Sequence, residues 1–194
     1  MSQAQRLVID LPDWVAALAG RQDSYRTDDE RMRLAVDLAR ENVLREGGGP
    51  FGAVVFDDKA GTVVAAAVNR VQQLANCALH AEVMALMFAQ QRVGCHTLYN
   101  EQGTEYVLAT SCDPCAMCLG AVLWSGVQRV VCGATRDDAT AIGFDEGPVF
   151  PESLLYLRER GVSITHGVLR AEATAVLQLY RDRNGVVYNG ATSR

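Results

Sequence analysis

Four side chains stand out because their types and spacing allow them to do chemistry together. His80 and Glu82 lie two residues apart at the head of HAEVMAL, an apolar run with helical spacing. Cys115 and Cys118 lie three residues apart in SCDPCAMCLG, at the head of a second such run. A His-x-Glu pair alone is common and indicates little more than a polar helix end. Together with the two cysteines, the pair predicts a metal site.

The two cysteines form one half of this predicted site. We expect Asp113 to cap the second helix and Pro114 to take its first position. Cys115 then lies in the first turn, with Cys118 one turn on along the same face. The free N–H groups and positive dipole end of a helix start favour thiolates, which suit Zn²⁺. Cys112 precedes the cap, so we expect its side chain to point elsewhere.

His80 would supply the third ligand, because both helix starts follow one sheet and can converge on one crevice. Three protein ligands leave the fourth position open, which is typical of a catalytic zinc that activates a water. Glu82 is not needed as a ligand, so it would accept a proton from that water and pass it to a leaving group. The alternative is that both cysteines fill the core and that Glu82 is surface charge.

Apolar periodicity predicts the elements that position these residues. Thr27 and Glu30 form a capping box that opens a helix through Arg45, and AVVFD and TVVAAAV form a β-hairpin. The remaining predicted elements are a helix over 76–91, a strand over 105–110, a helix ended by Gly126, the strand QRVVCGAT, the loop DDATAIGFDEGPVF, the helix SLLYLRERG, the strand VSITHGV and a helix ended by Gly185. This order predicts one domain over 1–194, with a mixed sheet between two helical layers. Residues 1–26 would be an N-terminal extension and residues 185–194 a tail.

Composition narrows the class of protein. The chain has 194 residues and is 49% hydrophobic, which is enough for one core without disulfide bonds. Its net charge of -5 argues against a protein that grips phosphate backbones, since such proteins usually have a basic face. We see no signal peptide and no apolar run of bilayer length, so we expect a cytoplasmic protein that makes no membrane contact. Six cysteines then indicate metal binding, catalysis or core filling rather than disulfide bonds.

The motif HAE followed by TSCDPCAMCLGAVLWSG resembles the cytidine-deaminase-like superfamily, in the branch that holds guanine deaminases and tRNA adenosine deaminases. The resemblance runs over about residues 33–147. It implies a three-layer α/β/α sandwich with a central mixed five-stranded sheet and one Zn²⁺ per chain. It also implies a water that attacks the amine-bearing carbon of a nucleobase. Asp113 stands where this family usually has glutamate.

Residues outside the zinc motif bear on which base is bound. By resemblance, Phe51 in GGGPFGAVV would stack on the base and Asn69 would hydrogen-bond one of its edges. Ala81, between the histidine and the glutamate, belongs to the same set of substrate contacts, and Trp124 is a candidate for the pocket wall. Phe51 and Trp124 are equally compatible with ordinary core aromatics.

The segments GFDEGP and GVVYNG resemble guanine deaminases in particular. The first resembles a loop in which an acidic pair, here Asp145 and Glu146, lies over the substrate. Glu146 would move a second proton or accept hydrogen bonds from the donor-rich edge of guanine. The second places Tyr188 in a tail that closes the pocket, often across a homodimer by exchange of that segment. Solvated loop charges and a frayed terminus are the alternatives.

The favoured function is therefore hydrolytic deamination of guanine to xanthine and ammonia. One alternative is a tRNA adenosine-to-inosine deaminase, but the acidic TRDDATAIGFDEGP does not suggest a basic face for nucleic acid. Others are a deaminase of another small amino heterocycle, such as an aminotriazine or cytosine, and a zinc-stabilised binding module without catalysis. Core filling is the default role that we expect for Cys77, Cys95 and Cys132.

Overall fold

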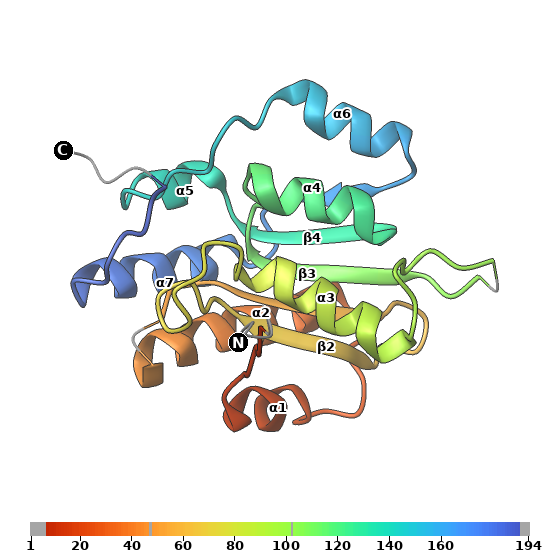
Figure 1. The fold of residues 1–194 in the computed structure, drawn as a ribbon, viewed down its shortest axis with the longest axis horizontal. Helices are drawn as coiled ribbons and strands as arrows, with labels where there is room; N and C mark the ends of the chain where they lie inside the picture. Colours follow the sequence, from red (N-terminus) through yellow and green to blue (C-terminus); the bar gives the residue numbers. More distant parts are fainter. Residues whose placement is uncertain (1–6, 47, 102, 191–194) are drawn as a thin grey trace, which may run out of the picture.

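The centre of the molecule is a mixed five-stranded sheet (Figure 1). The computed structural model describes residues 7–46, 48–101 and 103–190. The strands are β1 (Gly52–Asp57), β2 (Val63–Val68), β3 (Tyr106–Cys112), β4 (Arg129–Ala134) and β5 (Ser163–Thr165), in the order β2-β1-β3-β4-β5. β1 pairs antiparallel with β2 and β3, whereas β3, β4 and β5 run parallel. The predicted hairpin and mixed sheet are confirmed.

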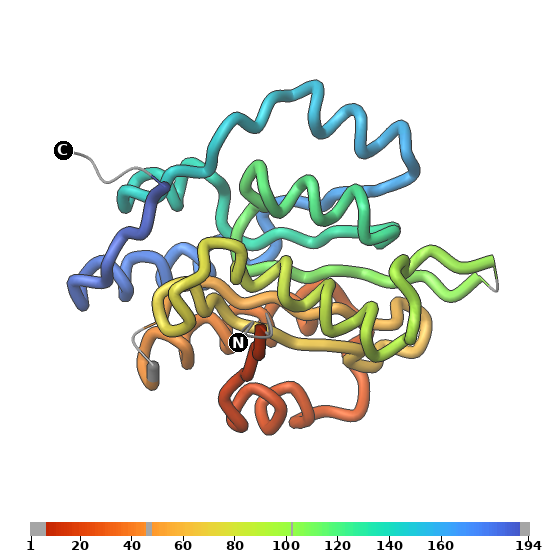
Figure 2. The backbone as a smooth tube through the Cα atoms, viewed as in Figure 1, coloured from red at the N-terminus to blue at the C-terminus, as the bar shows by residue number. Residues whose placement is uncertain are grey.

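Helices cover both faces of the sheet (Figures 1 and 2). They are α1 (Asp13–Ala19), α2 (Asp28–Glu41), α3 (Ala81–Val93), α4 (Ala116–Ser125), α5 (Arg136–Thr140), α6 (Pro151–Glu159) and α7 (Arg170–Asp182). Val107 and Ala109 of β3 face the core under α2 and α7, while Leu108 faces the core under α3 and α4. A strand buried on both faces reads as a continuous apolar run, as this one does. The predicted three-layer α/β/α sandwich is confirmed.

The end of α2 is fastened to the segment that follows it. Thr27 and Glu30 form the predicted capping box at its start. Its end continues into a π-helical turn, Asn42–Glu46. The buried Nδ2 of Asn42 donates hydrogen bonds to the carbonyl oxygens of Gly49 (2.9 Å) and Asn69 (3.0 Å). The segments around Gly49 and Asn69, which we predicted to line the substrate pocket, are therefore both hydrogen-bonded to the end of this helix.

Three predicted boundaries were wrong. α3 begins at Ala81 and not at Asn76, because the Asn76 side chain accepts a hydrogen bond from the Ala78 N–H and turns the chain instead. α4 begins at Ala116, because β3 stays paired with β4 as far as Cys112. The predicted loop after β4 contains α5, whose five residues are too few for periodicity to reveal.

The N-terminal extension contributes a helix. Val15 and Leu18 of α1 are buried in the core on the α2 side of the sheet, and the Tyr25 hydroxyl donates a hydrogen bond to the Ala19 carbonyl oxygen. Residues 1–6 of the extension and 191–194 of the tail lie outside the described residues. Among the described helices, none combines the length and apolar character needed to cross a bilayer.

Candidate active site

The three predicted metal ligands meet at the starts of α3 and α4. His80 Nδ1 lies 3.5 Å from Cys115 Sγ and 3.6 Å from Cys118 Sγ. Tetrahedral zinc with a Zn–N bond of about 2.05 Å and a Zn–S bond of about 2.3 Å separates such atoms by about 3.6 Å. The donor set and its spacing therefore fit zinc, with one side of the cluster facing a cavity.

His80 and Cys115 occupy equivalent positions in the fold. Each is the extended residue immediately before its helix, so each side chain projects from a helix start. The predicted capping role of Asp113 is therefore wrong. Its N–H donates to the Ala134 carbonyl oxygen (2.8 Å), continuing the strand pairing, and its carboxylate accepts a hydrogen bond from His166 Nδ1 (2.7 Å).

The two cysteines share one proton. A hydrogen bond from Cys118, with His80 beside it, lowers the pKa of Cys115 to about 4. The same bond and burial raise the pKa of Cys118 well above its ordinary value. A bound dication replaces this proton, because a coordinating thiol is deprotonated. As expected, Cys112 points elsewhere: its Sγ donates to the carbonyl oxygen of Thr135 (3.5 Å).

Glu82 lies beside this cluster in the first turn of α3. Its side chain is buried, and the residue is 5% exposed. Burial raises the pKa of the carboxyl group, and a thiolate at Cys115 adds to this effect. A bound dication at the neighbouring cluster acts in the opposite direction. A carboxyl group under these two opposing influences can accept a proton and give it up again, as a proton carrier must.

A cavity of about 300 Å³ opens over the cluster, at the lower end of the size range of small-molecule sites. Three aromatic rings stand at its wall. Phe144 makes edge-to-face contacts with Phe51 and with Tyr188, each with ring centroids 5.1 Å apart. Rings in this arrangement offer flat apolar surfaces to a flat ligand. Sequence analysis missed Phe144, although it directly precedes the acidic pair.

Two buried polar groups have no hydrogen-bond partner within the described part of the chain: the hydroxyl of Tyr188, which lines the cavity, and the Nδ2 of Asn69. Both side chains lie against Gly49, and Asn69 Oδ1 accepts a hydrogen bond from the Val71 N–H (3.2 Å). Buried polar atoms are nearly always paired, so each of these two can take a hydrogen-bond partner that the described chain does not supply.

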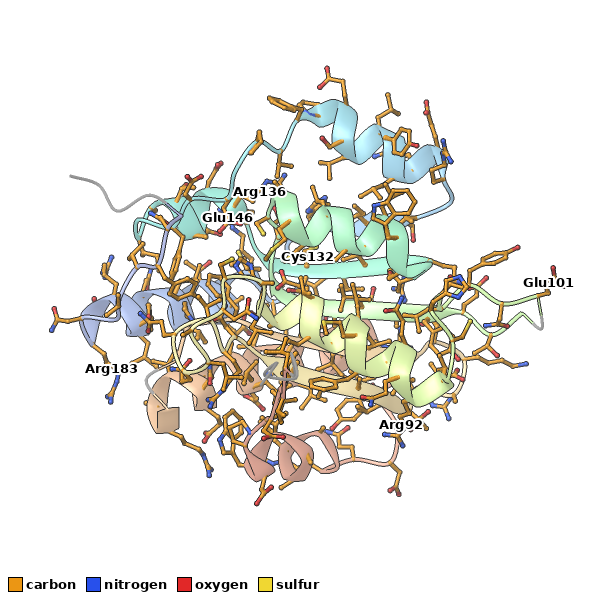
Figure 3. The ribbon with its side chains drawn as sticks, in the orientation of Figure 1. Arg92, Glu101, Cys132, Arg136, Glu146 and Arg183 are labelled. Atoms are coloured by element: carbon orange, nitrogen blue, oxygen red, sulfur yellow. The ribbon has the colours of Figure 1, made fainter. Side chains whose placement is uncertain are left out.

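The predicted acidic pair divides into two roles. Glu146 is half-buried at the cavity, beside the start of α4 (Figure 3), and burial raises its pKa to about 8, with Cys115 and Glu82 adding to the shift. Asp145 also reaches the cavity but is exposed, and its carboxylate accepts a hydrogen bond from the Gly147 N–H (2.9 Å). Asp145 therefore shapes the turn that presents Glu146.

Two other predicted contacts are placed differently. Trp124 is 80% exposed at the far end of α4, so its assignment to the pocket wall was wrong. It lies roughly two and a half helical turns beyond Cys115, and the cavity is at the opposite end of the helix. Ala81 is buried in the core under α3, so only its backbone can approach a ligand.

A second group of potential ligands was missed, and it consists of Asp113, Cys132 and His166. The Asp113–His166 distance of 2.7 Å is that of a hydrogen bond, whereas oxygen and nitrogen on tetrahedral zinc would lie about 3.3 Å apart. Burial, with Asp113 nearby, raises the pKa of Cys132 well above its ordinary value. No local spacing reveals this group, because His166 follows Asp113 by 53 residues.

This fold, with a His-Cys-Cys zinc site and a buried acid beside it, defines a zinc-dependent deaminase. The protein-family model for the cytidine and deoxycytidylate deaminase zinc-binding region matches residues 25–134 of this chain. The chain therefore belongs to this family.

Within the family, the chain is similar to proteins that act on guanine. It is 39% identical over 121 residues to the guanine deaminase of Bacillus subtilis, covering 62% of this chain and 73% of the relative. The solved guanine deaminase of Nitrosomonas europaea matches with a TM-score of 0.87 and 38% identity, covering 94% of this chain and 100% of that one. A variant solved with 8-azaguanine matches with a TM-score of 0.88 and 38% identity, covering 95% and 100%.

Proposed function

We propose that this protein is a guanine deaminase that hydrolyses guanine to xanthine and ammonia. One observation carries the proposal: the zinc-ligand cluster, a buried acid and a second acid share one aromatic-walled cavity. The named activity of two relatives and the 8-azaguanine complex of a solved variant support guanine as the base. The substrate belongs to the class of nucleobases, and guanine is the nucleobase that we propose.

Bound at His80, Cys115 and Cys118, zinc would supply a Lewis acid that activates a water for attack. The reaction joins the water oxygen to C2 of guanine and breaks the bond from C2 to the amine, which leaves as ammonia. Glu82 takes one proton from the attacking water and delivers it to the departing amine, and the second proton of the water goes to a ring nitrogen of guanine. The raised pKa of this carboxyl group suits a carrier that must both accept and release protons.

The cavity walls suit recognition of a flat, donor-rich base. Phe51 and Phe144 offer ring surfaces against which guanine can stack. The unpaired Asn69 Nδ2 is a donor for an acceptor atom of the base, and Tyr188 can also donate. Glu146 is an acceptor for the N–H groups of guanine and a second proton carrier beside the leaving amine. Asp145 keeps its hydrogen bond with the Gly147 N–H and thereby orients Glu146.

We further propose that the protein is a cytoplasmic homodimer. Exposed apolar side chains on α3 and α4 support a partner there, namely Met87 (43%), Met117 (38%) and Trp124 (80%). Light scattering should give twice the mass of one chain. Tail exchange is tested separately, by co-expressing Glu82→Ala chains with Tyr188→Ala chains. Mixed dimers recover activity only if each tail completes the partner's cavity.

The proposed activity is tested by incubating zinc-loaded protein with guanine, adenine, cytosine, an aminotriazine and a tRNA anticodon stem-loop, and measuring ammonia and base products. Guanine should be converted to xanthine. Inosine in the stem-loop with guanine untouched would overturn the proposal in favour of a tRNA deaminase.

Glu82→Ala is the matched control for catalysis. It should keep zinc and fold while lowering turnover by about 10²- to 10⁴-fold. Unchanged turnover would exclude Glu82 as the proton carrier. If the protein is a binding module without catalytic activity, neither the unaltered protein nor the Glu82→Ala variant will deaminate any of these substrates.

A further inference from the structure

The side chain of Asn189 joins the tail to the loop that carries Glu146 by two hydrogen bonds. Its Nδ2 donates a hydrogen bond to the Gly143 carbonyl oxygen (3.0 Å), and its Oδ1 accepts one from the Asp145 N–H (2.9 Å). These partners lie 46 and 44 residues away in the sequence. In Figure 2 the chain beyond α7 runs back to the neighbourhood of α5, from which this loop departs. A single amide therefore bridges two segments at the cavity mouth.

We infer that Asn189 is a positioning residue that fixes the loop 143–147 so that Glu146 faces the cavity. Within this loop, Phe144 is the one buried residue. Gly143, Asp145 and Gly147 are exposed, so burial does little to order their backbone. On the far side of Glu146, its own carbonyl oxygen accepts a hydrogen bond from the Ala116 N–H (2.9 Å) at the start of α4.

The acid thus lies between two attachments, one to α4 and one to the tail. Before Glu146, the loop is also held to α5, because the N–H groups of Gly143 and Phe144 donate to the carbonyl oxygens of Thr140 (2.9 Å) and Ala139 (3.3 Å). The ring of Phe144 adds packing against other aromatic rings, namely those of Phe51, Tyr180 and Tyr188. These contacts fix the depth of the loop and the peptide group before Phe144, but they do not hold the peptide group between Phe144 and Asp145. The Asn189 amide holds the peptide groups on both sides of Phe144, which sets the direction in which Glu146 leaves the backbone.

The tail is itself well placed to carry this contact. The Tyr180 hydroxyl of α7 donates a hydrogen bond to the Val186 carbonyl oxygen (2.7 Å), which fastens the tail as it leaves the helix. The Tyr188 hydroxyl is buried beside Asn69. Asn189 consequently couples the position of the acid to a tail that is held at Val186 and at Tyr188, just before Asn189.

Asn100 provides a matched control at the opposite end of the molecule. Its Nδ2 donates to the Thr104 carbonyl oxygen (2.9 Å), and its Oδ1 accepts from the Thr104 N–H (3.1 Å). It is therefore also an asparagine that bridges a loop through both amide atoms. Figure 3 shows its neighbour Glu101 far from Glu146. Asn100→Ala removes the same kind of contact without touching the cavity.

The first test measures hydrogen exchange in the full-length, zinc-loaded protein. Asn189→Ala frees the Asp145 N–H, so exchange over residues 141–147 should rise while zinc content and the unfolding midpoint stay unchanged. Asn100→Ala should raise exchange only around residue 104. Unchanged exchange over 141–147 in Asn189→Ala would overturn the inference.

The second test is kinetic and rests on the proposed function. Asn189→Ala should lower kcat for guanine by roughly tenfold to hundredfold, because small misplacements of a reacting group have effects of this size. KM should change far less, and Asn100→Ala should leave both constants unchanged. In a Glu146→Gln background, Asn189→Ala should have little further effect, within about twofold.

The two possible failures are distinguishable. A full further loss of kcat in the Glu146→Gln background would overturn the inference, because Asn189 would then act by another route. Unchanged turnover in Glu146→Gln alone would instead overturn the proposed role of Glu146. The exchange measurement reports on the Asn189 contact in either case.

Discussion

Two clusters of potential metal ligands flank the segment that leads from β3 into α4. Their members are His80, Cys115 and Cys118 in the first, and Asp113, Cys132 and His166 in the second. Both contain a histidine and a cysteine, and in both the ligand atoms lie within 4.8 Å of one another. Composition alone does not separate them, yet the two clusters are built for different purposes.

Donor spacing separates the two clusters. In the first, nitrogen-to-sulfur distances of 3.5 and 3.6 Å leave room for an ion, and a cavity lies alongside. In the second, the Asp113 carboxylate accepts a hydrogen bond from His166 Nδ1 at 2.7 Å, which is closer than two ligands of one zinc ion would lie. The second cluster therefore supports the first, because Asp113 begins the segment that presents Cys115. The lesson is that a zinc site is recognised by the space between its donors.

The largest expected effect follows from breaking the first cluster. Cys115→Ala removes one of three ligands, so the purified protein should contain no zinc and should show no turnover of guanine. Elemental analysis together with an ammonia assay measures both quantities. A full zinc content in this variant would contradict the assignment.

The next largest effect is expected from comparing substitutions of the two loop acids, Glu146 and Asp145. Glu146→Gln keeps the shape of the side chain but cannot carry a proton, so turnover should fall by about 10²- to 10⁴-fold with zinc retained. Asp145→Asn keeps an oxygen for the Gly147 N–H and should lower turnover far less. Equal losses in the two variants would show that the loop acts only through its conformation.

Breaking the second cluster should weaken zinc binding without abolishing it. His166→Ala frees the Asp113 carboxylate and loosens the segment before Cys115, so zinc affinity should fall by about tenfold. Competition with a chelator measures this change. His96→Ala alters an exposed histidine elsewhere and serves as the control. Loss of all zinc from His166→Ala would mean that the two clusters are not distinct in function.

The smallest expected effect concerns the buried thiol of the second cluster. Cys132→Ala removes a core sulfur, so the free energy of unfolding should fall by about 1–2 kcal/mol in a denaturant titration. Zinc content should stay at that of the unaltered protein. A loss of zinc equal to that of Cys115→Ala would identify Cys132 as a ligand.

The sequence could predict the first cluster because its parts are local. His80 with Glu82, and Cys115 with Cys118, each lie within one turn of a helix start, so spacing along the chain reports spacing in the molecule. The sheet and its layers were predictable for a related reason, since buried strands and amphipathic helices have different apolar periods.

The rest of the site depends on contacts between distant segments. His166 reaches Asp113 across 53 residues, and Asn189 reaches Gly143 across 46, with no pattern that pairs them in advance. Helix starts were misplaced where a side chain or a continued strand pairing overrode helical periodicity, as at Asn76. Trp124 was misassigned because an aromatic on the right helix can still lie at the wrong end of it.

The most direct test of the distinction between the clusters is a crystal structure of the zinc-loaded protein with anomalous diffraction recorded at the zinc absorption edge. We expect one peak per chain, between His80 Nδ1 and the Sγ atoms of Cys115 and Cys118, and no peak at Asp113, Cys132 and His166. A peak at the second cluster, or none at the first, would contradict this account.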